Sequence, residues 1–461
     1  MLKALRVVSG GLLLASFGCG MEGDVDEPIT EERSALAAAG NDYGVAETFH
    51  TSGTIDLTNP FFQALGTNPR TCMTCHNPDQ GWTMTAEANK QLFKDTDGLA
   101  PLFNLVDEGT RPDADISTKK ARKETFKANV IDLAVTRFTR TIPVAGDFTV
   151  APEDPSGFST PTSVLNFRRP TAVANEQKVS SILNTSAPTQ NILTTLQGLM
   201  SGAAGLHEQR DLVANPVPQV PTREDGANFM INVFFAQISD NQAGRLDAGG
   251  AMGGPANIPA FPFTLGMNDP TLPGFNRKVF NIFDAWEVFA VNGKHSNDCE
   301  EDAKAAIYRG QEVFNFNEFV ISGVPGFTDL SGTETPVTGT CSTCHNTPNI
   351  GGHSVIRMMD IGTADEPNCS PGLPILAVTK KNTDPPVTRR ICDMGRGGNG
   401  VFADLAKFRV PPLRGLAARA PYFHDGGARN IRAAIRYHED RFNIDLSHGK
   451  RKDLEAFLGA L

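Results

Sequence analysis

The chain has 461 residues, 42 of them basic and 52 acidic, and its formal net charge is −10 at pH 7. This length is enough for two or three domains with sizeable cores, and the acidic balance gives no reason to expect a nucleic-acid partner. The 44 glycines and 31 prolines predict rather short elements joined by many loops.

The N-terminal residues, 1–19, have the features of an export signal. Lys3 and Arg6 precede an apolar run, VVSGGLLLASFG, that is too short to cross a membrane as a helix. The run ends at Cys19, which predicts a lipoprotein-type cleavage and acylation site. Residues 20–47 are polar and acidic, as a flexible tether would be. We therefore expect a periplasmic or cell-envelope protein that is anchored to a membrane by a lipid on Cys19.

The first chemical motif is CMTCH, which contains Cys72, Cys75 and His76. Two thiols followed by a histidine can ligate zinc, exchange disulfides or attach a haem, and CxxCH is the attachment signature of c-type haem. On one helical turn both sulfurs lie on the same side, where they can form thioethers with the two haem vinyl groups. The adjoining imidazole can then bind the iron. Export agrees with this interpretation, because covalent haem is attached outside the cytoplasm.

The chain as a whole is predicted to be mainly helical. Helical periodicity is clearest in the segments 121–140, 191–213, 276–292, 301–316, 430–442 and 447–461. Strong alternation typical of strands is scarce, so the expected fold is mainly α, with two cytochrome-c-like haem domains and long loops. Residues 215–275 are rich in Pro and Gly, and two interpretations stay open: an insert that shapes access to a site, or a passive surface loop.

The opening motif recurs as CSTCH, with Cys341, Cys344 and His345. A single zinc site made of both cysteine pairs is not expected, because the pairs stand roughly 270 residues apart and zinc ribbons use compact spacings. The two motifs predict two covalently bound haem c groups. They also predict two related domains, a first haem c domain at 48–299 with the Pro/Gly-rich insert and a second at 300–461.

Further candidate ligands and thiols follow the second motif. His353, Met358 and Met359 are additional residues that can bind iron or contact the haem edge. Cys369 and Cys392 flank a Pro-rich loop. In an oxidising compartment a disulfide that closes this loop and a pair of free thiols are both open interpretations.

The segment FRVPPLRGLAARAPYFHDGGARNIRAAIRYHEDRF, residues 408–442, is the second strong signal. Its PYFHDG core, together with two CxxCH motifs, resembles the bacterial di-haem cytochrome c peroxidase family, which includes the MauG-like enzymes. The resemblance covers most of residues 48–461 and is specific at the haem motifs and at 409–442. It implies a two-domain, all-α architecture in which one iron can be opened to peroxide while the other haem stores and passes electrons.

The resemblance implies a ligand for the second haem. In the family this ligand lies fourteen residues after the histidine of PYFHDG, and here the same count runs from His424 to His438, with Tyr437 beside it. The helical pattern points to the same residue, because His438 shares an apolar face with Ile435. We expect His438 to bind the iron held by His345, with an ordinary core histidine as the alternative. His424 is expected to have a structural role near the haem edge.

The resemblance also implies a Gln and a Glu ten residues apart on a helix over the first haem. Gln197 stands at the Gln place, and ten residues later is His207 instead of Glu, with Glu208 next. A distal histidine can move protons near neutral pH, or it can bind the iron held by His76 outright. A surface histidine is the alternative. The family's bridging tryptophan is missing from 184–191, which argues against fast electron exchange between the haems.

The expected function is that of a peroxidase-like di-haem oxidoreductase, which passes electrons from a donor through the second haem to H2O2 at the first. Two alternatives stay open: a non-catalytic electron-transfer cytochrome, and a MauG- or rubber-oxygenase-like enzyme that oxidises a larger substrate. The expected partner is a small electron-donor protein, a cytochrome or a cupredoxin. Carbonyls at Arg419 and Pro421 take the places that bind calcium in the family, so Ca2+ between the domains is a further expectation.

Overall fold

The computed structural model describes residues 38–181, 192–208, 220–291 and 298–461. The export signal and the acylation site at Cys19 lie outside the described residues, as does most of the expected tether. Residues 38–47, which were also assigned to the tether, instead form β1 and most of β2. No helix in the described ranges is long and apolar enough to cross a membrane.

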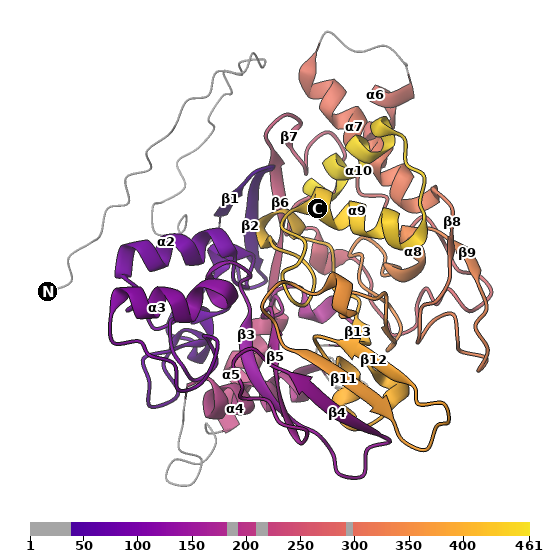
Figure 1. Ribbon diagram of the computed structural model, residues 1–461. Helices are drawn as coiled ribbons and strands as arrows, with labels where there is room; N and C mark the ends of the chain where they lie inside the picture. Colours follow the sequence, from indigo (N-terminus) through magenta and orange to yellow (C-terminus); the bar gives the residue numbers. More distant parts are fainter. Residues whose placement is uncertain (1–37, 182–191, 209–219, 292–297) are drawn as a thin grey trace, which may run out of the picture.

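The described residues form a mixed α/β fold, with helices and strands interleaved along the chain (Figure 1). The helices are α2 (Ala86–Thr96), α3 (Lys119–Phe126), α4 (Ile192–Leu206), α5 (Val220–Ile231), α6 (Glu287–Val291), α7 (Cys299–Phe316), α8 (Cys341–Cys344), α9 (Ile431–Phe442) and α10 (His448–Gly459). The strands are β1 (Ala38–Asn41), β2 (Gly44–His50), β3 (Thr136–Thr141), β4 (Phe148–Glu153), β5 (Ser163–Arg168), β6 (Val233–Asp240), β7 (Gly244–Arg245), β8 (Phe319–Ile321), β9 (Val337–Gly339), β10 (Met358–Met359), β11 (Ile375–Lys380), β12 (Thr388–Ile391) and β13 (Phe408–Arg409).

The expectation of a mainly α fold was wrong, because the described residues contain 13 strands in five sheets. The reason lies in how these strands are buried. In β6 the first six residues are all buried, and in β5 the four central residues are buried, so neither strand shows the alternation of a strand with one wet face. Several other strands have only two to four residues and are too short to give a periodic signal.

The sheets join segments that are far apart in the sequence. The largest has the order β1-β2-β6-β7, and a second has the order β12-β11-β4, so that β4 pairs antiparallel with a strand more than 200 residues later. In Figure 1 these three strands lie together at the lower edge of the molecule. The pairing of β4 with β11 joins segments on opposite sides of the domain boundary expected at residue 299. The division into two haem domains stays a prediction.

The predicted helices have mixed outcomes. Those expected at 301–316, 430–442 and 447–461 are confirmed as α7, α9 and α10. The helix expected at 121–140 ends at residue 131 and gives way to β3, while 276–292 is mostly loop before α6.

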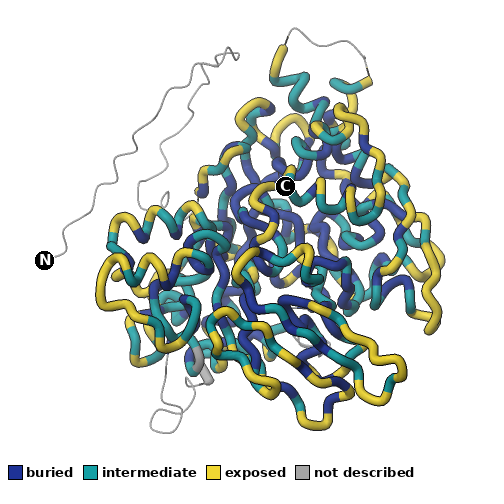
Figure 2. Tube along the Cα trace, in the orientation of Figure 1, coloured by how far each residue is buried: buried dark blue, intermediate teal, exposed yellow. Residues whose placement is uncertain are grey.

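Buried residues gather in the middle of the molecule (Figure 2), and among the described residues they form five hydrophobic clusters. Residues 234–286 pack with α7, α9 and α10 in the largest cluster, against which Cys341 also packs. The interpretation of 215–275 as a surface excursion therefore does not hold for residues 233–261, since Phe234, Ile258 and most of β6 lie in the interior. Cys72 instead packs against a separate cluster formed by Trp82, α4 and α5.

Candidate functional site

The two CxxCH motifs adopt the same local geometry. Each CxxC segment forms one short helical turn, at Cys72–Thr74 and in α8, as the sequence leads one to expect. At the start of each turn a threonine N–H donates to the hydroxyl of the threonine three residues later, at 3.0 Å for Thr71 and 2.9 Å for Thr340. The four motif cysteines form no disulfide in the structure. Both turns therefore present two sulfurs and a following histidine.

Each motif histidine is oriented by a backbone carbonyl. His76 Nδ1 lies 3.3 Å from the carbonyl oxygen of Trp82, and His345 Nδ1 lies 2.6 Å from that of Gly351. Carbonyl bonds of this kind fix the tautomer of a metal-binding histidine and leave Nε2 for the metal. The turn-rich segments that follow the two motifs thus have the same structural role, because each supplies the carbonyl that orients the imidazole ring of its motif histidine.

The environment keeps both rings neutral. Burial lowers the pKa of His76 to about 4, opposed by the carbonyls of Trp82 and Thr171. Burial likewise lowers the pKa of His345 to about 4, opposed by the carbonyl of Gly351. Both residues nonetheless keep some solvent-accessible surface. A neutral imidazole is the form that binds a metal.

His438 lies beside the second motif. It is close enough to His345 that its charge lowers the pKa of that histidine. Its own Nδ1 bonds the Ala434 carbonyl at 2.8 Å, one turn back in α9, so Nε2 is again the nitrogen left over. Phe423 and Phe442 stand around the ring, with centroids at 6.0 and 6.4 Å. The adjacent Tyr437 is engaged elsewhere, because its hydroxyl donates to the Ile361 carbonyl at 2.8 Å.

The other candidate ligands near the second motif are buried. His353 is held against the motif itself, since its Nδ1 lies 2.7 Å from the Cys344 carbonyl oxygen, and its effect on the pKa of His345 is smaller than that of His438. Met358 and Met359 lie in β10, which pairs with β13. Their binding to iron stays a prediction.

His207 stands beside the first motif, directly after the end of α4. Its N–H donates to the Ala203 carbonyl at 2.8 Å, and its charge lowers the pKa of His76, which places the two rings near each other. Its Nδ1 bonds a carboxylate oxygen of Asp107, so that Nε2 faces away from this anchor. The side chain of His207 is 45% exposed, so part of it reaches solvent.

A buried charged cluster surrounds this anchor. Arg70 forms ion pairs with Asp107 and, at 2.8 Å, with Glu108, and all three side chains are at most 5% exposed. Burial alone raises the pKa of Asp107, but its bond to His207 and the charge of Arg70 hold that pKa well below its usual range. Burial and the neighbouring Asp107 raise the pKa of Glu108 well above its usual range.

The cluster reaches the motif sulfurs. Arg70 Nη2 lies 3.4 Å from Cys75 Sγ, and carboxylate oxygens of Glu108 and Glu208 lie 4.0 Å from Cys75 Sγ and Cys72 Sγ. Sequence reasoning missed Arg70, Glu108 and the role of Asp107. Arg70 alone had a signal, as a basic residue just before the motif, while the acidic pair comes more than thirty residues later.

Gln197 is not brought close to His207. Residues 197–206 are one continuous helical segment of α4, and nine helical residues span roughly 14 Å along the axis. Gln197 is half-buried and follows Leu196, which packs in the core that also includes Met200 and Trp82. Its role in catalysis stays a prediction that this placement does not support.

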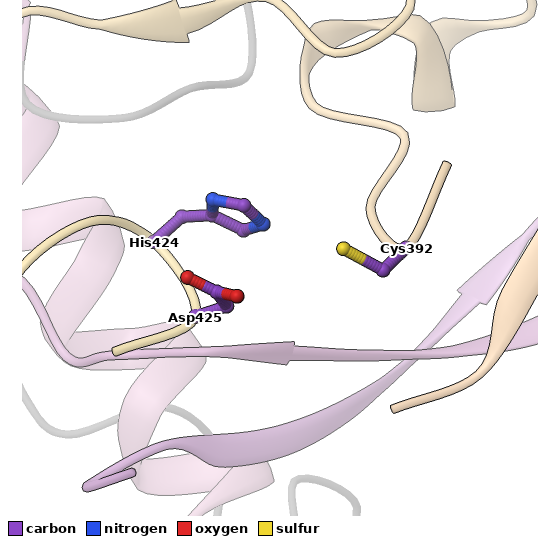
Figure 3. Close-up of side chains that lie close together, drawn as sticks. All are labelled: Cys392, His424 and Asp425. Carbon is purple, nitrogen blue, oxygen red and sulfur yellow. The ribbon is translucent and has the colours of Figure 1, made fainter. Parts of the chain in front are cut away.

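One further group of metal-binding residue types meets in the described part of the chain. Cys392, His424 and Asp425 lie close together (Figure 3). The disulfide left open by the sequence is present, however, with Cys369 Sγ and Cys392 Sγ 2.12 Å apart, so Cys392 offers no thiolate. Asp425 accepts from Ser370 N at 2.9 Å, and the His424 ring stacks on Phe408, so these residues have structural roles.

Comparison with known proteins adds no assignment, because no family model and no curated protein matches this sequence. The resemblance described above therefore rests on the two CxxCH motifs and the PYFHDG segment alone.

Proposed function

We propose that this protein carries two covalently attached haem c groups and works as a peroxidase-like di-haem oxidoreductase. The attachment residues are Cys72, Cys75 and His76 at the first site and Cys341, Cys344 and His345 at the second. The observation that carries the proposal is that each motif histidine has a second histidine beside it, and that all four rings are anchored through Nδ1.

The residues fit haem better than zinc. Zinc needs its ligand atoms gathered around one point, but among the described residues the two sulfurs and the histidine nitrogen of neither motif all lie within 4.8 Å of one another. Among the described residues the four motif cysteines do not gather into one cluster, since Cys72 and Cys341 pack against different cores. Thiols that become thioethers suit the attachment of haem, which supplies the electron-carrying iron when bound.

The two sites differ in ways that assign their tasks. Phe423 and Phe442 flank His438, which would hold the iron of the second haem together with His345 and leave that haem to store electrons. His207 is partly exposed and hydrogen-bonded to Asp107, the arrangement of a histidine that takes up and gives back a proton. We therefore assign the encounter with H2O2 to the first site, with His207 as the proton-moving residue.

The second candidate function is electron transfer without turnover. It is favoured by the similarity of the two sites, because His207 is as firmly anchored through Nδ1 as His438 and can close the first iron in the same way. The expected donor in both cases is a small cytochrome or cupredoxin. Export, anchoring through Cys19 and the bound calcium ion remain part of the proposal.

Mass spectrometry and spectroscopy of the exported protein test this function. The intact mass must show two haem adducts, and EPR and optical titration of the half-reduced protein with CO and H2O2 must reveal one ligand-accessible iron. If neither iron ever becomes high-spin or binds CO, the peroxidase function is refuted and the electron-transfer function remains. His438→Met must change the EPR signal of the second haem, whereas Tyr437→Phe, the matched control on the next residue, must leave it unchanged.

A further inference from the structure

Arg414, Arg419 and Arg169 form no ion pair with a carboxylate in the part of the chain that the structure describes. Arg414 is 0% exposed, Arg419 is 8% exposed, and Arg169 is half-buried with its Nε fully enclosed and unbonded. The side chains of all three donate hydrogen bonds to backbone carbonyls. Arg169 donates to Met84, Arg414 donates to Asn349 and Gly254, and Arg419 donates to Gly415 and Pro412. Burial lowers the pKa of Arg169 and Arg414 to about 9 and that of Arg419 to about 10, so all three stay charged at neutral pH.

Two of these arginines meet beside the first motif. Arg169 donates to the carbonyl of Met84, and the side chain of Arg419 passes so close to Gly81 that a Cβ there would lie 2.4 Å from Arg419 Cγ. The segment between these two contacts contains Trp82, whose carbonyl holds the ring of His76. Arg169 and Arg419 thus lie against the two ends of residues 81–84, and in keeping with this the charge of Arg419 lowers the pKa of Arg169.

The neighbours of this pair do not neutralise it. Tyr422 is uncharged at neutral pH, because burial raises its pKa above the usual range and its hydroxyl donates to the Leu416 carbonyl at 2.9 Å. Arg409 is a third cation, whose charge lowers the pKa of Arg419. Its Nη2 lies 3.9 Å from Oε1 of its own partner, Glu176. An isolated buried charge is costly, and two like charges side by side are more so, unless an anion compensates them.

We propose that Arg169 and Arg419 form a buried carboxylate-binding site next to the first CxxCH motif. Resting on the proposed function, we assign its occupant as a propionate of the haem attached at Cys72 and Cys75. Planar guanidinium groups bind carboxylates through paired N–H donors, which suits a ligand that must be held in one orientation.

Arg414 provides a matched control. It is buried as deeply as Arg419 and lies only five residues away, but its donors go to the carbonyls of Asn349 and Gly254. No second cation affects the pKa of Arg414, in contrast to those of Arg169 and Arg419. Arg414→Gln should therefore lower stability without creating a charge imbalance at the first haem.

The test is a pH series of spectroelectrochemical titrations of the holoprotein. In Arg169→Gln and Arg419→Gln the potential of the first haem should fall and become pH-dependent near neutrality, because an unpaired carboxylate stabilises oxidised iron and now titrates. The potential of the second haem should not move, and Arg414→Gln should leave both potentials as in the wild type. If the glutamine variants do not fold, Arg419→Lys keeps the charge without the planar fork and should show a weaker form of the same pH dependence.

A second experiment, thermal unfolding with added anions, distinguishes a haem propionate from a free anion as the occupant of the site. With a propionate in place, added acetate or phosphate should not change the thermal midpoint of the wild-type holoprotein. A rise in that midpoint that Arg419→Gln abolishes would confirm the carboxylate-binding site but assign it to a free anion. The proposed carboxylate-binding site is refuted if every folded Arg169 and Arg419 variant has the same haem potentials, pH profiles and responses to added anions as the wild type. If mass spectrometry finds no haem, the proposed function fails, and the acetate arm alone decides on the site.

Discussion

Replacing Asp107 by Asn tests whether the buried charged cluster supports the first site. One carboxylate oxygen of Asp107 accepts from Arg70 and the other from His207. An amide has only one acceptor oxygen, so Asp107→Asn must turn an N–H2 group toward one of these two donors. The variant leaves Arg70 paired with Glu108, and it removes the Asp107 charge that helps to raise the pKa of Glu108.

The expected loss in unfolding free energy follows from the burial of the Arg70–Asp107 ion pair. Arg70 is 1% and Asp107 5% exposed in their side chains, so solvent does not screen the interaction. Removing one partner of such a buried pair costs about 3 to 5 kcal/mol, and Asp107→Asn should lie near about 3 kcal/mol because Glu108 still lies beside Arg70. The measurement is urea unfolding of the holoprotein at pH 7, followed by far-UV circular dichroism.

The pH dependence has a defined sign. The folded-state pKa of Asp107 is held below its unfolded value, so its contribution is fully present above about pH 4 and is lost as the pH falls through the folded pKa. The difference between wild type and Asp107→Asn should therefore persist from pH 5 to 8 and shrink only below about pH 4. Asp113→Asn is the control, because its pair with Arg111 is exposed and surface pairs contribute little. Equal unfolding free energies for Asp107→Asn and wild type at pH 7 would refute the reasoning.

Two further predictions concern packing and pH. Gly310→Ala should lower the unfolding free energy by about 2 kcal/mol, because its Cβ would lie 1.9 Å from the Asp453 carbonyl oxygen between α7 and α10. Gly449→Ala in α10, whose nearest atom is 4.0 Å away, should be neutral or slightly stabilising in the same urea series, and equal losses in the two variants would contradict this explanation. Burial raises the pKa of Glu176 to about 7, although Arg409 lowers it, so the wild type should lose stability as the pH rises from about 4.5 to about 7. Glu176→Gln should remove this slope, and an unchanged slope in a pH series of thermal midpoints would show that Glu176 is not its source.

The sequence by itself determined the local features. A CxxCH segment needs only one helical turn to place its sulfurs and histidine, and both segments form that turn. His438 was singled out by helical periodicity within α9 and by a residue count from His424, which precedes that helix, and its role as an iron ligand stays a prediction. The helices α7 and α10 were predicted for the same reason.

Tertiary structure decided which segments meet. The pairing of β4 with β11 joins residues more than 200 positions apart, and strands buried on both faces give no alternating pattern to signal it. The anchoring of His207 by Asp107 and the meeting of Arg169 with Arg419 likewise depend on contacts between distant segments. Burial then changes the chemistry of these side chains, because removing water makes each charge require a partner. Sequence patterns therefore singled out the candidate cofactor-binding residues, and only the folded chain showed which charges surround them.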